Sequence, residues 1–336
     1  MAIQTYENFV LENKMTDLVN TNLDVNALFT TDNSLEQAAG LKKIVNKYTY
    51  SGAVEKLAKG AKNSTKGSVT FVPTEYEVER YQQTYEYNDM DVMQDPYVVD
   101  VASTGAATLM ANEIKAEYFD ELAKISNEFA YTTLNYDAIV DGLASINREV
   151  ESDQFIVMGI KARATIRKDN DFKASRQGEI LYSGQFGTIS GVPCVFSKLC
   201  EDDELYITSK DQVKFFVKKA GNVEQDRDIE TKDNTVVYER HGVMALVDET
   251  KSVRLAKAAT TATTVTATKN ATKVTGAATT GADVKVYVNG ELVATGKASN
   301  SAYDISFTKA LASGDNVKVV ARKAGQVSSS AEATVA

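Results

Sequence analysis

The chain has 336 residues, of which 43% are hydrophobic and 25% charged, proportions that are ordinary for a folded protein with a sizeable core. Its 46 acidic and 37 basic side chains give a formal charge of −9, which argues against a uniform basic face for nucleic acid, so contacts with DNA are expected to be weak. It contains no run of about twenty apolar residues and starts without the basic and apolar stretches of a secretion signal, so we expect no membrane segment and synthesis in the cytoplasm.

An extended hairpin is predicted in the segment 47–88. Strand-like segments begin at Tyr48 and Val69 and enclose a tip that is rich in glycine and lysine. Because a compact domain would have difficulty covering two such arms by itself, we expect the hairpin to pack on a neighbouring subunit. The candidate inter-subunit contacts are Lys56, Lys59, Lys62, Lys66, Tyr76 and Tyr81.

A long amphipathic helix is predicted after Asp95-Pro96, because apolar residues recur there at spacings of three and four over roughly 30 residues. Its buried positions would be Ala107, Met110, Ile114, Tyr118, Leu122, Ile125 and Phe129. A second helix is predicted over 136–150, with Asn135 or Asp137 as its cap. The first helix would act as a rigid strut.

Further along, buried strands alternate with short structural elements. A strand is predicted at Phe155–Gly159, followed by a short helix that contains Ala162 and Ile166. The segment Gly187–Ser197 indicates a strand after a turn. In the last segment, Val236–Leu255, Arg240-His-Gly is predicted to form a turn that leads into a final strand.

A change of composition near residue 256 indicates a domain boundary, because a Thr- and Ala-rich stretch starts there. Beyond it, Asn289-Gly290 predicts a tight hairpin turn between two alternating segments, 283–288 and 291–295. Two more alternating segments follow, and no helix signal occurs, so a small β-sandwich is expected. This part carries a charge of +4, which leaves −13 for residues 1–255.

The C-terminal segments also resemble a known class of domain. The pattern Val-Tyr-Val-Asn-Gly-Glu-Leu-Val-Ala at 286–294, followed by Val-Val-Ala-Arg-Lys-Ala-Gly at 319–325, is similar to bacterial immunoglobulin-like domains. Such domains are often attached to surface proteins and to phage structural proteins. Because its linker follows the last strand of the preceding part and its positive charge contrasts with the acidic residues 1–255, this part is expected to project outward from whatever the rest of the chain builds.

The preceding segments, taken in order, resemble the major capsid proteins of tailed bacteriophages with the HK97-type fold. The resemblance rests on the order of hairpin, long helix, strands and return segment more than on any one motif. It implies an α+β fold with an arm, extended loop, spine helix, and axial and peripheral domains, plus the small all-β immunoglobulin-like sandwich. The implied parts are an N-terminal arm at 1–46, the extended loop at 47–88, a peripheral domain with the spine helix at 89–133, a mainly axial domain at 134–234, a return to the peripheral domain at 235–255, and a linker with the immunoglobulin-like domain at 256–336.

Two departures limit what the resemblance implies. The best-known member of the family joins its subunits covalently, through a lysine of the extended loop and an asparagine of a neighbour. Here nothing fixes the asparagine or the catalytic carboxylate, so that chemistry is not carried over. No long charged coiled-coil segment precedes the arm, so a scaffolding protein, where one is used, is expected to be a separate chain.

Catalytic, cofactor and metal sites are not expected. His241 is the only histidine, and it lies in the turn-like tetrapeptide 239–242 without a paired nucleophile motif. Neither a phosphate loop nor a dinucleotide fingerprint is present, and the acidic runs do not have the spacing of a calcium loop. Cys194 and Cys200 lack the spacing of a zinc site and are predicted to be buried, reduced thiols.

Together these features predict a capsid protein that assembles with copies of itself into pentamers and hexamers of an icosahedral-type head. Its expected partners are a portal, a separate scaffolding protein and, through weak contacts, the packaged DNA; its location is the virion. The C-terminal domain either binds a cell-surface glycan or decorates the shell without a ligand. Two alternatives stay open: the shell of an encapsulin-like nanocompartment, and an adhesion protein that carries an immunoglobulin-like module.

Overall fold

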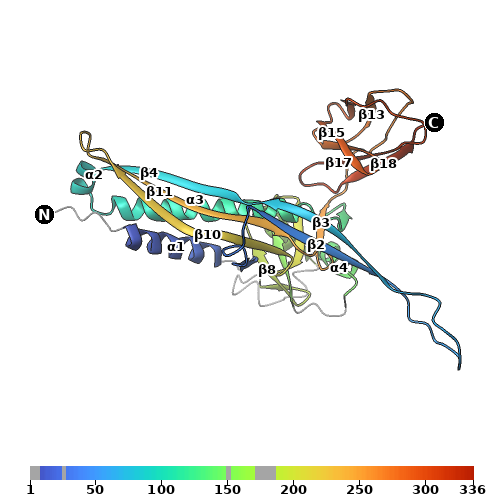
Figure 1. Ribbon diagram of the computed structural model, residues 1–336, viewed down its shortest axis with the longest axis horizontal. Coiled ribbons are helices and arrows are strands. Elements are labelled where there is room, and N and C mark those ends of the chain that lie inside the picture. Colours follow the sequence, from blue (N-terminus) through green and yellow to red (C-terminus); the bar gives the residue numbers. More distant parts are fainter. Residues whose placement is uncertain (1–7, 25–27, 149–152, 171–186) are drawn as a thin grey trace. The chain divides into compact units, whose positions relative to one another are not determined.

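The chain passes repeatedly between two units in the computed structural model, which describes residues 8–24, 28–148, 153–170 and 187–336. The first unit comprises 1–124 and 209–249, and the second comprises 125–208 and 250–336. Figure 1 labels their helices and strands. In the described part of the chain, no helix is long and apolar enough to cross a membrane.

A four-stranded sheet forms the centre of the first unit. Its order is β1 (Thr30–Asp32), β10 (Val213–Arg227), β11 (Asp233–Leu246) and β4 (Glu79–Asn88). The two longest strands, β10 and β11, run antiparallel, and in β11 buried residues alternate with less buried ones from Asn234 to Gly242. This alternation is what a sheet with one covered face requires.

Two helices pack against this sheet and against each other, α1 (Asn8–Asp24) and α3 (Val98–Leu122). Leu11, Met15 and Val19, spaced four residues apart, are buried along one stripe of α1. Between the helices, the ammonium of Lys14 forms an ion pair with Asp100. The short helix α2 (Asp89–Gln94) precedes α3 and begins with a capping box.

Helix α3 is shorter than its pattern of apolar residues predicts. It ends at Leu122, so the prediction that Ile125 and Phe129 continue the helix is wrong. Phe129 instead belongs to β5 (Glu128–Tyr131), which pairs with a strand near residue 255. The helix at Asn135 also ends early, because α4 spans Tyr136–Ser145.

A hairpin is present, but it spans 42–77 and not 47–88 as predicted, and it consists of β2 (Lys42–Ser51) and β3 (Ser68–Glu77). Its strands are antiparallel from Lys42↔Glu77 at the base to Ser51↔Ser68 below the tip. Strand β4 follows directly but pairs with β11 of the central sheet, not with the hairpin. The hairpin is therefore a two-stranded ribbon attached to one edge strand of the first unit (Figure 1).

The second unit contains a six-stranded mixed sheet. Its order is β5, β12 (Val253–Lys257), β9 (Glu204–Ser209), β6 (Gln154–Met158), β8 (Val192–Phe196) and β7 (Thr188–Ile189). Helices α4 and α5 (Ile160–Lys168) contribute Ile139, Leu143 and Ile166 to the core beside this sheet. The strand predicted at Phe155 and the short helix after it are thereby confirmed.

The C-terminal strands of the second unit form two smaller sheets around one core. One sheet pairs β13 (Lys273–Ala277) with β16 (Ala302–Ser306), and the other has the order β15 (Glu291–Lys297), β14 (Asp283–Val288), β17 (Asn316–Arg322) and β18 (Ser329–Thr334). Their buried side chains belong to a single cluster. Asn289 and Gly290 have φ angles of 52° and 87°, so the predicted hairpin turn is confirmed.

Candidate assembly surface

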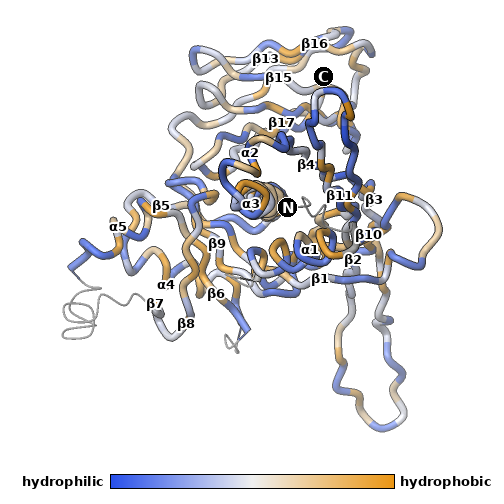
Figure 2. Tube along the Cα trace, turned by 90° about the vertical axis from the view of Figure 1, so that its left-hand side faces the viewer, coloured by the Kyte–Doolittle hydropathy of each residue, from blue (hydrophilic) through white to orange (hydrophobic). Residues whose placement is uncertain are grey.

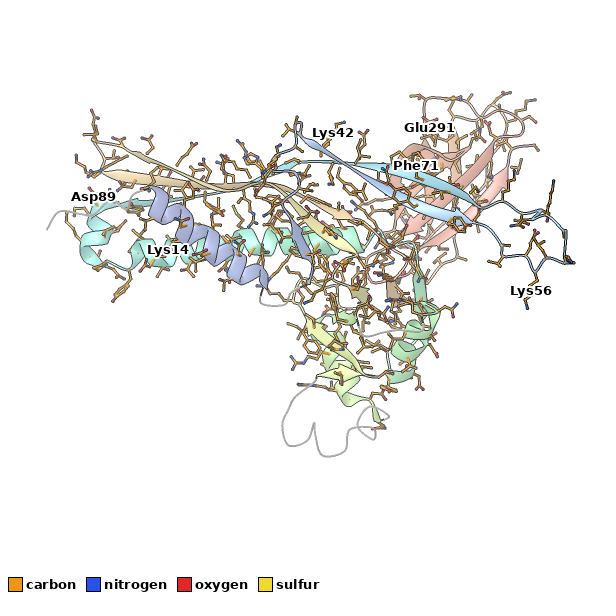
Figure 3. All side chains as sticks on the ribbon, turned by 60° about the horizontal axis from the view of Figure 1, so that its bottom comes forward. Lys14, Lys42, Lys56, Phe71, Asp89 and Glu291 are labelled. Carbon is orange, nitrogen blue, oxygen red and sulfur yellow. The ribbon has the colours of Figure 1, made fainter. Side chains whose placement is uncertain are left out.

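Exposed apolar residues form a strip along one face of the hairpin. Tyr48 lies opposite Phe71 and Tyr50 opposite Val69, so that all four side chains point to the same side of the ribbon. Their exposed fractions are 69%, 61%, 70% and 60%, in that order. The rings of Tyr48 and Phe71 lie 6.4 Å apart. We call these four residues the aromatic strip; Figure 3 labels Phe71 on it.

The inner half of the hairpin is anchored to the first unit, whereas the outer half is not. Val45 is buried with Leu35 and Phe216, and the ammonium of Lys43 lies 4.3 Å from the centre of the Phe216 ring. Lys47 forms an ion pair of 3.1 Å with Glu249. Beyond these contacts, Figures 1 and 2 show the ribbon standing apart from the other elements of its unit.

A clasp closes the tip of the hairpin. The carboxylate of Glu55 accepts hydrogen bonds from the backbone amides of Ser64 and Thr65, at 2.9 and 2.8 Å, and from the Ser64 hydroxyl at 2.6 Å. These bonds favour the ionised form and lower the pKa of Glu55 to about 2. The side chains of Lys56, Lys59, Lys62 and Lys66 around the clasp are all exposed.

The two tyrosines predicted as inter-subunit contacts lie at the base of the hairpin and make contacts within the chain. Tyr81 is 7% exposed, and its hydroxyl donates a hydrogen bond to Glu117 of α3. Tyr76 is half-buried, and burial together with the charge of Glu121 raises its pKa to about 12. A role of either tyrosine toward a neighbouring subunit stays a prediction.

Glu117 is a residue that sequence patterns did not single out. Burial raises its pKa to about 7, and the nearby carboxylates of Glu79 and Glu113 act in the same direction, although the hydrogen bond from Tyr81 opposes them. The hairpin base therefore contains a carboxyl group that titrates near neutral pH. In the sequence Glu117 cannot be distinguished from a solvent-facing residue of an amphipathic helix, because the burial that raises its pKa arises only in the folded chain.

The expected polar turn at Arg240-His-Gly is absent, and that prediction is wrong. His241 lies within β11, paired with Lys219 on one side and Arg80 on the other. Its Nε2 lies 3.5 Å from a carboxylate oxygen of Glu239. The glycine that suggested a turn instead leaves room for the Phe215 ring, since a Cβ on Gly242 would lie 2.5 Å from that ring.

The remaining candidates for chemistry are few. Among the described residues, no group of three or more His, Cys, Asp or Glu side chains could hold a metal ion. Cys200 is buried, and burial raises the pKa of its thiol, as expected for an unreactive cysteine. Cys194 also carries a thiol rather than a disulfide and is only partly buried. The segment 171–186 lies outside the described residues.

Comparisons with known proteins give matches in structure only. No protein-family model matches the sequence, and no curated protein matches it. The capsid of a native GTA particle superposes with a TM-score of 0.58 at 12% identity, over 71% of this chain and 91% of that one. The capsid of Cyanophage P-SCSP1u gives 0.53 at 11% identity, over 68% and 86%. A virus-like particle from Pyrococcus furiosus gives 0.52 at 12% identity, over 74% and 98%.

These matches agree with the geometry described above, in which an extended hairpin, a long helix and a mixed sheet follow one another along the chain. At 11–12% identity the likeness concerns the fold alone. Over the matched 71% of its length, the chain has a mixed α+β fold like that of HK97-type capsid proteins.

Proposed function

We propose that this protein is a major capsid protein, which assembles with copies of itself into a closed shell around packaged DNA. The observation that carries the proposal is the aromatic strip, because the chain builds a two-stranded ribbon and leaves its apolar face uncovered. Exposed apolar surface of this kind marks a site of protein contact. In a chain with a capsid fold, a second copy is the partner that fits.

In this proposal the hairpin reaches across to a neighbouring subunit, and many repeated contacts of modest size hold the shell together. Helix α3 serves as the strut of the peripheral domain, and the second unit supplies the axial domain that surrounds the five-fold and six-fold axes. A portal and a separate scaffolding protein would be further partners. The C-terminal strands would form an immunoglobulin-like domain on the outer surface.

Electrostatics favour the same arrangement. The exposed lysines of the tip, ordered by the Glu55 clasp, are complementary to a body whose residues 1–255 carry a net charge of −13. Such complementarity mainly accelerates encounter and fixes orientation, and salt screens it. The apolar strip would then supply most of the binding free energy.

The test is to express the chain alone and with its genomic neighbours, and to examine both preparations by sedimentation and electron microscopy. Hollow polyhedral particles or rings of five and six subunits are expected. In a variant, residues 52–67 are replaced by Asn-Gly, which can connect the directly paired Ser51 and Ser68 as a two-residue turn. This variant should fold but form no shells; normal particles would refute the role of the hairpin.

A nanocompartment shell is the second candidate, favoured by one observation. The virus-like particle from Pyrococcus furiosus matches over 98% of its own length, so this fold also builds that particle. The two candidates differ in their contents. Purified shells that carry one co-purifying protein and no DNA would favour the nanocompartment, whereas nuclease-protected DNA in particles made with the genomic neighbours would favour the capsid.

A further inference from the structure

A buried ion triad lies where the C-terminal strands meet the six-stranded sheet of the second unit. The side chain of Arg254, on β12, is 0% exposed and forms ion pairs with Glu204 of β9 and Glu128 of β5. The two carboxylates are 4% and 14% exposed. Charges that are removed from water require further hydrogen bonds, because the pairing alone leaves donors and acceptors unsatisfied.

Some of these further bonds come from the loop between β17 and β18. Arg254 Nη2 donates to the backbone oxygen of Gln326 at 2.8 Å. The backbone amide of Gly325 donates to Glu204 Oε1, also at 2.8 Å. Gly325 has a φ of 76°, and a Cβ at this position would lie 3.2 Å from Cβ of Asp203, so a glycine suits this close approach.

Two further sets of contacts hold the same loop. Ser328 donates to Glu128 twice, from its backbone amide at 2.6 Å and from its hydroxyl at 3.0 Å. The backbone amide of Lys257 donates to the Gly325 oxygen at 3.1 Å, and the amide of Val327 donates to the Lys257 oxygen at 2.9 Å. The loop thus adds a short parallel bridge to the end of β12.

We infer that the loop 325–328 is a structural part of the six-stranded sheet and clamps the C-terminal strands to it in one orientation. The C-terminal strands are then not a module on a flexible tether. They are joined to the sheet covalently after β12, and the loop attaches them a second time, more than sixty residues later in the chain. Both carboxylates of the triad accept hydrogen bonds from the loop. This inference concerns the single chain and does not depend on the formation of shells.

The experiment measures a distance between two spin labels in the unassembled full-length chain, by pulsed electron paramagnetic resonance. Labels are attached at Ala144→Cys on α4 and Glu291→Cys on β15, both exposed, in a background with Cys194→Ser and Cys200→Ala. The clamp variant combines Gly325→Pro with Ser328→Pro, which removes both amide donors to the carboxylates. Its control is Gly314→Pro, another positive-φ glycine with a hydrogen-bonded amide, in the turn before β17.

A narrow distance distribution is expected in the parent and in Gly314→Pro, with a several-fold broader one in the clamp variant. Circular dichroism shows whether each variant has kept its β-structure. Should the proline pair fail to fold, Ser328→Ala supplies a milder change, for which an intermediate broadening is expected. A broad distribution in the folded parent would overturn the inference, as would an unchanged narrow distribution in the folded clamp variant. Neither outcome would bear on shell formation, which is tested separately.

Discussion

The hydroxyl of Tyr81 donates a hydrogen bond to the carboxylate of Glu117, which connects strand β4 at the base of the hairpin to helix α3. This contact places a carboxyl group of raised pKa, about 7, between β4 and α3. Since Glu117 binds its proton more tightly in the folded chain than in the unfolded one, its contribution to stability is largest below pH 4.5. The contribution is lost as the pH rises to 7.

We therefore expect Glu117→Gln to raise the melting temperature at pH 8, because glutamine still accepts from Tyr81 without a charge to bury. The increase should be about 2–4 °C, the shift that corresponds to roughly 1 kcal/mol in a unit of this size, after allowance for partial exposure. At pH 4 the variant and the parent should melt together. Asp120→Asn, at an exposed position of the same helix, is the control and should show no such pH dependence.

The aromatic strip can be separated from the stability of the subunit. Tyr48→Ser with Phe71→Ser should change the free energy of unfolding by less than about 1 kcal/mol, because both side chains are already exposed. Shell assembly, followed by light scattering, should fall at least tenfold. The control is the double variant Thr49→Ala with Thr70→Ala, because these two residues lie opposite one another on the other face of the ribbon. If both double variants assembled equally well, the aromatic strip would not be part of the interface.

Replacement of the four tip lysines by glutamine should slow assembly and also weaken its dependence on salt. The reason is that exposed charges act mainly on the rate of encounter, and ions screen them within about 10 Å at 0.1 M. The measurement is the initial rate of assembly at several salt concentrations. As a control, glutamine substitution of Lys273, Lys285, Lys309 and Lys318, which are exposed residues beyond residue 256, changes the net charge equally. A similar loss of rate in that control would mean that net charge, not the tip, is responsible.

Acid should open the clamp between the C-terminal strands and the six-stranded sheet. Burial opposes ionisation of Glu204, but the Arg254 guanidinium and the Tyr206 hydroxyl outweigh it and hold the pKa of Glu204 below its usual 4.5. Stability from this group is thus present above pH 4.5 and is lost as the pH falls through its lowered pKa. The spin-label distance distribution should broaden only in that acid range. In Glu204→Gln this transition should be absent.

Arg254→Met should destabilise the second unit by about 3–5 kcal/mol, because it leaves two buried carboxylates without their cation. Adding Glu204→Gln and Glu128→Gln should restore part of that loss, since the neutral amides still accept from the loop amides. Urea unfolding followed by circular dichroism measures both. If the triple variant were less stable than Arg254→Met alone, burial of unpaired carboxylates would not be the cause of the destabilisation.

The parts of the fold that could be predicted were those specified by local pattern. The turn at Asn289-Gly290 needs a positive φ at both positions, and the sequence places there the two residue types that adopt it most readily. The end of α3 could not be predicted in the same way, because the apolar spacing of a helix continues through Phe129. That residue pairs instead with β12, which lies far along the chain. The hairpin was predictable from its strands, but the clasp at its tip and the contact of Tyr81 on β4 with Glu117 depend on side chains that meet only after folding.

The ribbon of β2 and β3 also has a consequence for how accurately copies of the chain could be arranged. A two-stranded ribbon without a second layer is only marginally stable in water, so its outer residues must lose conformational freedom when they dock. That loss offsets much of the contact energy and keeps each single docking event weak and reversible. A subunit added in the wrong position can then leave before its neighbours enclose it, whereas a correct one is retained by contacts on several sides. In the proposed shell, the exposed ribbon would thereby allow a misplaced subunit to dissociate before it is enclosed.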